Sequence, residues 1–153
     1  MDEYVRFSKA MKIPQQLEQI NSDNLKYNFR GRAEVDEYIK IEEIKSELRD
    51  LGVKGKIKIP PEPIDTSKLS FDDNHVNKER EHEITAEEAK QFIEEANVSF
   101  ERWGGTFINN YSNAGASYVR KSDNVIRTAY SKEEYTGDAV IIEEVLKKHG
   151  RWK

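Results

Sequence analysis

The sequence predicts an α+β fold: a helix, then a four-stranded antiparallel meander sheet, then a C-terminal helix, with a helical N-terminal appendage. Three observations support it: a helix-start signal at Thr85, four short strand-like runs separated by turn signals, and an amphipathic helix near the C-terminus. Because one helix cannot cover such a sheet, we expect both helices to contribute to the core.

The helix that begins at Thr85 has the clearest start signal in the chain. Thr85 and Glu88 have the spacing of a capping box, and Ile84 can pack on Ala89 as a hydrophobic staple. The apolar residues that follow recur at helical spacing, at Ala89, Phe92, Ile93 and Ala96. One apolar stripe of this kind is typical of a helix that packs on a core.

The strand-like runs cover residues 98–103, 106–111, 116–121 and 125–130. Turns this short force neighbouring strands to pair antiparallel. Alternation within the last run predicts that Arg127 shares a face with Ala129 and opposes Ile126. The closing helix is expected to start near Asp138 and to end at Gly150.

The rest of the chain divides by composition. Residues 1–60 are expected to form a helical or extended N-terminal region, with a helix over 35–51 and a short edge strand over 54–59. Residues 61–70 form a Pro-rich connection, and residues 71–153 form the α+β domain.

The composition limits the classes of function. Charged residues make up 35% of the chain and the net charge is -4, so any contact with nucleic acid must be local. The absence of cysteine excludes disulfides and thiolate chemistry. The sequence shows no signal peptide and no apolar run of membrane-spanning length. We therefore expect a soluble, cytoplasmic protein with no membrane partner.

Two of the three histidines, His75 and His82, lie just before the capped helix with Asn77 and Arg80 nearby. Each histidine alone suits a hydrogen-bonded structural role, but two on one short segment favour general acid–base chemistry near neutral pH. A metal site that adds Asp73 is a rival, although its spacing matches no zinc pattern. We expect no metal and no cofactor.

Arg127 lies within the last predicted strand, where an arginine needs a partner. It can anchor a carboxylate inside the domain, or it can hold a phosphate through its bidentate fork. In RNA the 2′-hydroxyl itself can act as the nucleophile, so a protein needs to supply a base, an acid and cations. The four candidates for these catalytic roles are His75, His82, Arg80 and Arg127.

Four runs of sequence occur in the order HVNKEREH, ITAEEAKQFIEEA, FINNYSNAGASYV and IRTAY. Together they resemble the C-terminal domain of minor head proteins from phages of Gram-positive hosts. That domain is related to the phage group of the barnase, EndoU, colicin and RelE-like nuclease fold. The resemblance covers about residues 54–150.

The resemblance implies a helix packed on a four-stranded sheet and metal-independent RNA cleavage in a host cell or a virion. It adds substrate-binding candidates to the catalytic ones above, namely Asn77, Tyr111, Ser112, Tyr118 and Thr128. RNA is then the candidate substrate. The alternative is a non-enzymatic phage or mobile-element module, structural or inhibitory, that binds a host or virion protein. The net negative charge suits such a protein partner.

Overall fold

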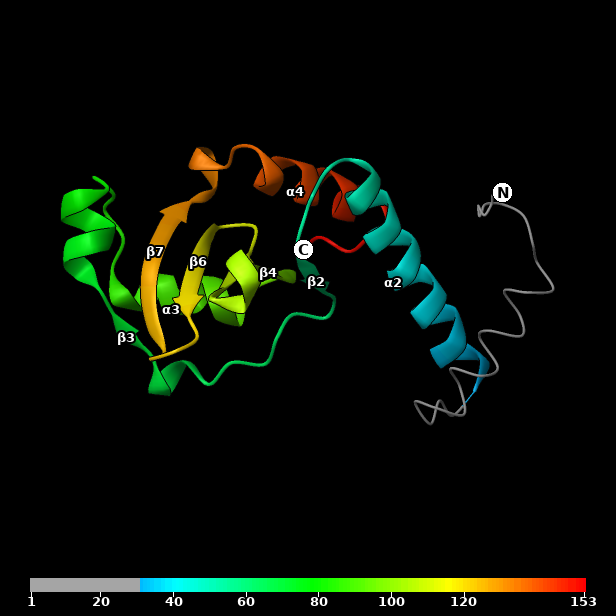
Figure 1. Cartoon of the computed structure of the whole chain (residues 1–153), viewed down its shortest axis with the longest axis horizontal. Helices are drawn as coiled ribbons and strands as arrows, with labels where there is room; N and C mark the ends of the chain where they lie inside the picture. The colour runs from blue at the N-terminus through cyan, green and yellow to red at the C-terminus, as the bar shows by residue number, and fades with distance from the viewer. Residues whose placement is uncertain (1–30) are drawn as a thin grey trace. The chain divides into compact units, whose positions relative to one another are not determined.

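The computed structural model describes residues 31–153, so residues 1–30 of the predicted N-terminal region lie outside the described part of the chain. The chain divides into two compact units, residues 1–43 and 44–153, and the second contains every described strand (Figure 1). Within the described residues, no helix has the length and apolar character needed to span a bilayer.

Helix α2 (Arg32–Asp50) confirms the helix predicted over 35–51. Its last two turns belong to the second unit, where Ile44 and Leu48 are fully buried in the core. The second unit therefore begins inside α2, whereas the sequence placed a boundary at residues 61–70.

The centre of the sheet is the predicted meander. Its four strands pair antiparallel with their neighbours and are β4 (Val98–Arg102), β5 (Phe107–Tyr111), β6 (Gly115–Arg120) and β7 (Val125–Ser131). The predicted edge strand is also present, as β2 (Lys56–Lys58) paired antiparallel with β4.

The expectation of a four-stranded antiparallel sheet is corrected by two outer strands. The sheet has six strands in the order β2-β4-β5-β6-β7-β3, and β3 (Ser70–Phe71) pairs parallel with β7. A strand of two residues has no periodicity that a sequence could reveal. Its pairing with a segment about 55 positions away depends on tertiary structure.

Short helical segments lie between the strands and helices. They are the 3₁₀ turns η1 (Thr66–Lys68), η3 (Trp103–Gly105) and η4 (Lys132–Glu134), and the π-helical segment η2 (Asn74–Glu79).

The two faces of the sheet are covered by different helices. Helix α3 (Ala86–Glu94) packs on one face, here called the helix face, where Phe92 and Ile93 join a core cluster with Ile126. Helix α4 (Asp138–Lys148) and the end of α2 contribute to the core on the opposite face. Figure 1 shows α3 behind β6 and β7 and α4 along one end of the sheet. Both predicted helices therefore contribute to the core.

A β-bulge at Arg127 changes the predicted facing of β7. Tyr118 pairs with Thr128, but Val119 pairs with Ile126, so Arg127 is the extra residue. Inserting one residue reverses the facing of everything beyond it. The prediction that Ile126 opposes Ala129 was therefore wrong, because both residues are buried in the cluster under α3.

Gly115 allows α3 to approach the sheet closely. A Cβ atom at this position would lie 2.5 Å from the Phe92 ring and 2.6 Å from the Tyr130 carbonyl oxygen. The ring belongs to the core and the carbonyl belongs to β7, so neither can move aside easily.

We therefore expect Gly115→Ala to lower the free energy of unfolding by about 1–3 kcal/mol, the usual cost of overpacking. Chemical denaturation measures this change. The matched control is Gly31→Ala, since a Cβ atom there would have no neighbour within 4 Å. Equal stabilities for the two variants would contradict the close approach.

The capping box predicted at Thr85 is confirmed in both directions. The Thr85 hydroxyl oxygen accepts a hydrogen bond from the Glu88 amide at 3.1 Å, and the Glu88 carboxylate accepts one from the Thr85 amide at 2.9 Å. These bonds satisfy two backbone donors at the start of α3.

Replacing Thr85 with alanine should destabilise the protein by about 1 kcal/mol, because an amide of the first turn loses its acceptor. Glu88→Ala should also destabilise the protein, and the effects of the two changes should be less than additive in a double-mutant cycle. Glu87→Ala is the control, since it removes the same charge from the same turn without removing a cap bond. Denaturation curves with fully additive effects would argue against a coupled box.

Candidate functional site

Of the catalytic candidates from the sequence, His75 contacts Arg127 but His82 pairs with Glu134 instead, so the two histidines and Arg127 do not converge on one site. The segment η2 places His75 with its Nδ1 atom 3.4 Å from Nη2 of Arg127 and 3.0 Å from Oε1 of Glu79. One ring nitrogen cannot both donate to Glu79 and accept from Arg127. Because the contact to the Glu79 carboxylate is shorter, we assign a hydrogen to Nδ1 of His75, which donates to that carboxylate. The Arg127 guanidinium donates to Asp72 at 2.9 Å. This geometry favours the carboxylate-anchor interpretation of Arg127.

His82, in the loop between η2 and α3, lies beside a different part of β7. Its Nδ1 is 3.1 Å from Oε2 of Glu134, and its ring centroid is 5.9 Å from that of Tyr130. Within residues 31–153, no hydrogen bond joins His82 to His75 or Arg127. Arg127 and Tyr130 are three residues apart on β7, which separates the two histidine contacts by about 10 Å along the strand.

The contact with Glu134 favours one tautomer of the His82 ring. An ionised carboxylate accepts hydrogen bonds only, so Nδ1 of His82 carries the hydrogen. The other ring nitrogen, Nε2, then remains for proton transfer, as when an acidic partner orients a functional imidazole. The His82 side chain is 13% exposed, so its ring is mostly enclosed but accessible at one edge.

Asn77 holds the loop that carries His82. Its Nδ2 donates to the carbonyl of Ile84 at 2.8 Å, and its Oδ1 accepts from the amide of Ile84 at 2.8 Å. Between these two residues the chain turns through Glu81, which has a φ of 60°. The structure thus uses Asn77, expected to bind substrate, to close the loop from 77 to 84.

Asn77→Ala should lower the free energy of unfolding by about 1–3 kcal/mol, because both backbone groups of the buried Ile84 lose their partner. Thermal and chemical denaturation measure the loss. Asn74→Ala is the matched control on the same segment, since its amide bonds only the exposed side chain of Glu79. A loss at Asn74 as large as that at Asn77 would contradict the clamp.

The remaining sequence candidates have varied surroundings. Ser112 is buried and shapes the turn between β5 and β6, where its hydroxyl donates to the carbonyl of Gly115 and accepts from the amide of Gly115. Thr128 pairs with Tyr118 across β6 and β7. Arg80 is exposed and makes no hydrogen bond or ion pair within the described part of the chain.

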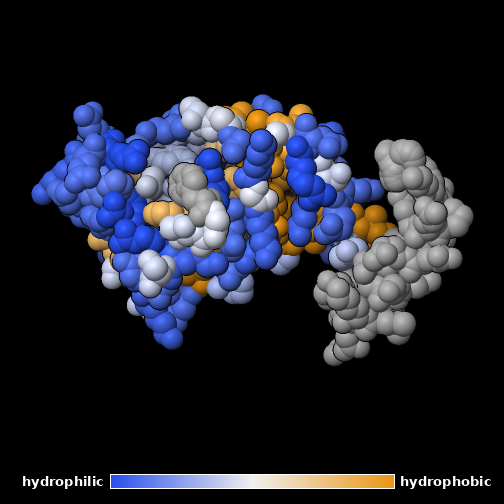
Figure 2. Space-filling view, viewed as in Figure 1, coloured by the Kyte–Doolittle hydropathy of each residue, from blue (hydrophilic) through white to orange (hydrophobic). Residues whose placement is uncertain are grey.

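The ion-pair cluster of His75, Glu79, Arg127 and Asp72 is partly exposed, with exposed side-chain fractions from 18% to 57%. In Figure 2 the end of the molecule that carries η2 and β3 is predominantly hydrophilic.

A polar pocket of about 350 Å³ lies on the sheet face opposite α3. This face is here called the tyrosine face, because Tyr111, Tyr118 and Tyr130 project from it. The pocket is lined by these tyrosines, by Arg102 of β4, and by the start of α4 at Gly137 and Asp138. Two of the sequence candidates, Tyr111 and Tyr118, are therefore brought together.

Sequence reasoning missed Arg102, Tyr130 and Glu134. Strand alternation could have found Arg102, since it follows the buried Phe100 by two residues and so shares its face. The short turn between β6 and β7 could have indicated that Tyr130 lies opposite Ala116, which pairs in turn with Tyr111 on β5. No signal in the sequence links Glu134 to His82, because 52 residues separate them.

The tyrosine hydroxyls form a hydrogen-bonded chain. Asn109 donates from Nδ2 to the hydroxyl of Tyr111 at 3.4 Å, the hydroxyls of Tyr111 and Tyr118 lie 3.3 Å apart, and those of Tyr118 and Tyr130 are also hydrogen-bonded. Burial raises the pKa of each tyrosine well above its usual value, so all three hydroxyls stay protonated at neutral pH. They can donate hydrogen bonds but cannot serve as bases.

Asn109 begins this chain and is fully buried. Its Oδ1 atom has no hydrogen-bond partner within the described residues. An unsatisfied buried acceptor costs about 1–3 kcal/mol. The amide is therefore retained at some expense in stability, and its visible use is to donate to Tyr111.

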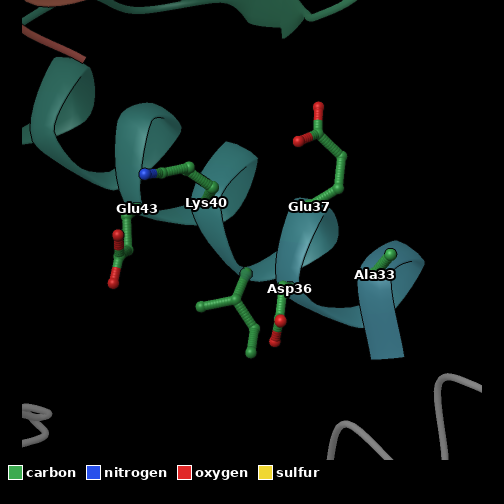
Figure 3. Close-up of a pocket in the computed structure, with 6 residues that line it drawn as sticks. Ala33, Asp36, Glu37, Lys40 and Glu43 are labelled. Carbon is green, nitrogen blue, oxygen red and sulfur yellow. The ribbon is translucent and has the colours of Figure 1, made fainter. Parts of the chain in front are cut away.

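A second hollow lies along the first turns of α2 (Figure 3). The side chains of Asp36 and Glu43 point to one side of the helix and that of Glu37 to the other. They do not converge on a common point. Among residues 31–153, no three His, Asp or Glu side chains form a group suited to a metal ion.

The fold is of the α+β class, with a six-stranded mixed sheet, one helix on one face and a polar pocket on the other. Comparisons with protein-family models, with curated proteins and with solved structures find no match for this chain.

Proposed function

We propose that this chain is a nuclease-like domain that cleaves RNA by histidine acid–base chemistry at the tyrosine-face pocket. The observation that carries the proposal is the pairing of His82 with Glu134 beside Tyr130, a residue of the pocket. An oriented imidazole can act as the base and the guanidinium of the pocket can stabilise the phosphorane, with solvent as the proton donor to the leaving oxygen. The resemblance to phage minor head proteins supports a phage setting for the activity.

The reaction is a transesterification within the RNA. Nε2 of His82 takes the proton of a 2′-hydroxyl, whose oxygen forms a bond to the neighbouring phosphorus. The bond from phosphorus to the 5′-oxygen breaks, and that oxygen takes a proton from solvent. The products are a 2′,3′-cyclic phosphate and a 5′-hydroxyl, and His82 returns its proton to solvent.

His82 suits the role of base better than His75. His82 pairs with Glu134 and its ring centroid lies 5.9 Å from that of Tyr130, a residue of the pocket, whereas His75 belongs to an ion-pair cluster with Glu79, Arg127 and Asp72. Within this cluster the guanidinium of Arg127 is already engaged by a carboxylate. The guanidinium that lines the tyrosine-face pocket is that of Arg102.

His82→Ala should reduce RNA cleavage by about a hundredfold or more, the usual contribution of a general base. His75→Ala should reduce it by less than about tenfold. The assay follows a single-stranded oligonucleotide with one ribonucleotide in a DNA chain, in the presence of EDTA, and identifies the cyclic phosphate by mass spectrometry. An all-DNA strand should stay intact because it lacks the 2′-hydroxyl.

His149→Ala is the matched control. His149 also pairs with a glutamate, Glu47, at 2.8 Å, but it lies at the end of α4. It should keep full activity. A folded wild-type protein that leaves RNA intact would overturn the proposal and favour the alternative of a protein-binding module.

A further inference from the structure

The pocket on the tyrosine face has the chemistry of an anion site. We propose that it binds the phosphate group of the nucleic acid, with the Arg102 guanidinium and the Tyr130 hydroxyl as the main donors. This inference rests on the proposed function and deepens it, because it assigns a separate substrate-binding subsite to residues that sequence analysis did not select.

The hydroxyl chain gives Tyr130 a donor that faces outward. Asn109 donates to Tyr111, and in the arrangement that we propose the Tyr111 hydrogen points to Tyr118 and the Tyr118 hydrogen points to Tyr130. The hydrogen of Tyr130 is then left over at the end of the chain. Hydrogen bonds in series polarise one another, so the last hydroxyl is a stronger donor than an isolated phenol.

Arg102 supplies the positive charge of the pocket. It lines the pocket together with Tyr111, Tyr118 and Tyr130, and against the larger effect of burial its charge acts to lower the pKa of all three tyrosines. A guanidinium presents several N–H donors in a planar fork that matches phosphate oxygens. The start of α4 adds to this field, since Gly137 at its N-terminus provides no side-chain cap.

Asp138 provides a test in which phosphate binding should become stronger rather than weaker. This carboxylate also lines the pocket. An acidic group there repels a phosphate, so its removal should strengthen binding. A pocket that merely held a neutral ligand would show no such gain.

The binding experiment uses an isotopically labelled full chain and three probes: inorganic phosphate, adenosine 3′-monophosphate and adenosine. The nucleotide should shift the amide signals of Gly137 and Asp138, and adenosine should bind at least about tenfold more weakly because it lacks the charged group. Binding by inorganic phosphate as tight as by the nucleotide would mean that a free anion, rather than RNA, is the ligand, and would overturn the assignment to nucleic acid.

Four variants test the donors by the change in dissociation constant. Arg102→Gln and Tyr130→Phe should each weaken nucleotide binding by about tenfold, as expected for a hydrogen bond to a charged group. Asp138→Asn should tighten it by a few-fold. Tyr135→Phe is the matched control, since its hydroxyl donates to the carbonyl of Ser112 and lies outside the hydroxyl chain.

Unchanged affinity in folded Arg102→Gln and Tyr130→Phe proteins would overturn the subsite. The His82→Ala variant distinguishes failure of the phosphate subsite from failure of the proposed nuclease function. If this variant binds the nucleotide normally and wild-type protein does not cleave RNA, the subsite stands and the nuclease fails. If Arg102→Gln cleaves RNA at the wild-type rate with wild-type nucleotide affinity, the nuclease stands and the subsite fails.

Discussion

The pair of hydrogen bonds between the Asn77 amide and the backbone of Ile84 is the contact on which the proposed site depends. It closes a loop that begins in η2 and ends one residue before the cap of α3. The loop thus has fixed ends, one on each of two helical segments that pack against the sheet. His82 lies within this loop, where its ring contacts Tyr130 and its Nδ1 lies 3.1 Å from Oε2 of Glu134. Asn77 would therefore act as a positioning residue, because its side chain bonds backbone groups and holds the loop that carries His82.

The sheet separates structural and chemical roles between its faces. On the helix face, α3 packs closely because Gly115 has no side chain, and the buried residues there are mainly apolar. On the tyrosine face, the tyrosines combine edge-to-face packing with a chain of hydroxyls. Each phenol ring contributes to the core while its oxygen remains in a polar pocket. This arrangement lets one set of residues stabilise the fold and present hydrogen-bond donors.

Local sequence signals predicted the elements well and their partners poorly. The capping box at Thr85, the four meander strands and the closing helix depend on residues within a few positions of one another, and each was predicted. The bulge at Arg127 was missed because it is defined by the register of β6 against β7. Among the catalytic candidates, His75 lies near Arg127, whereas His82 pairs with Glu134. The pairing of His82 with Glu134 was not predicted, because it joins residues 52 positions apart and no local sequence pattern indicates that they are close in space.

The sequence by itself determined the α+β class, the helix that follows His82 and the residue types available for acid–base chemistry. These follow from periodicity, from capping and from side-chain pKa values, which are properties of short segments. Tertiary structure decided that Arg127 would engage Asp72, that Asn77 would hold a loop, and that Arg102 and Tyr130 would share a pocket. The physical reason is that a charged or polar side chain takes whichever partner the packing of distant strands brings within hydrogen-bond reach.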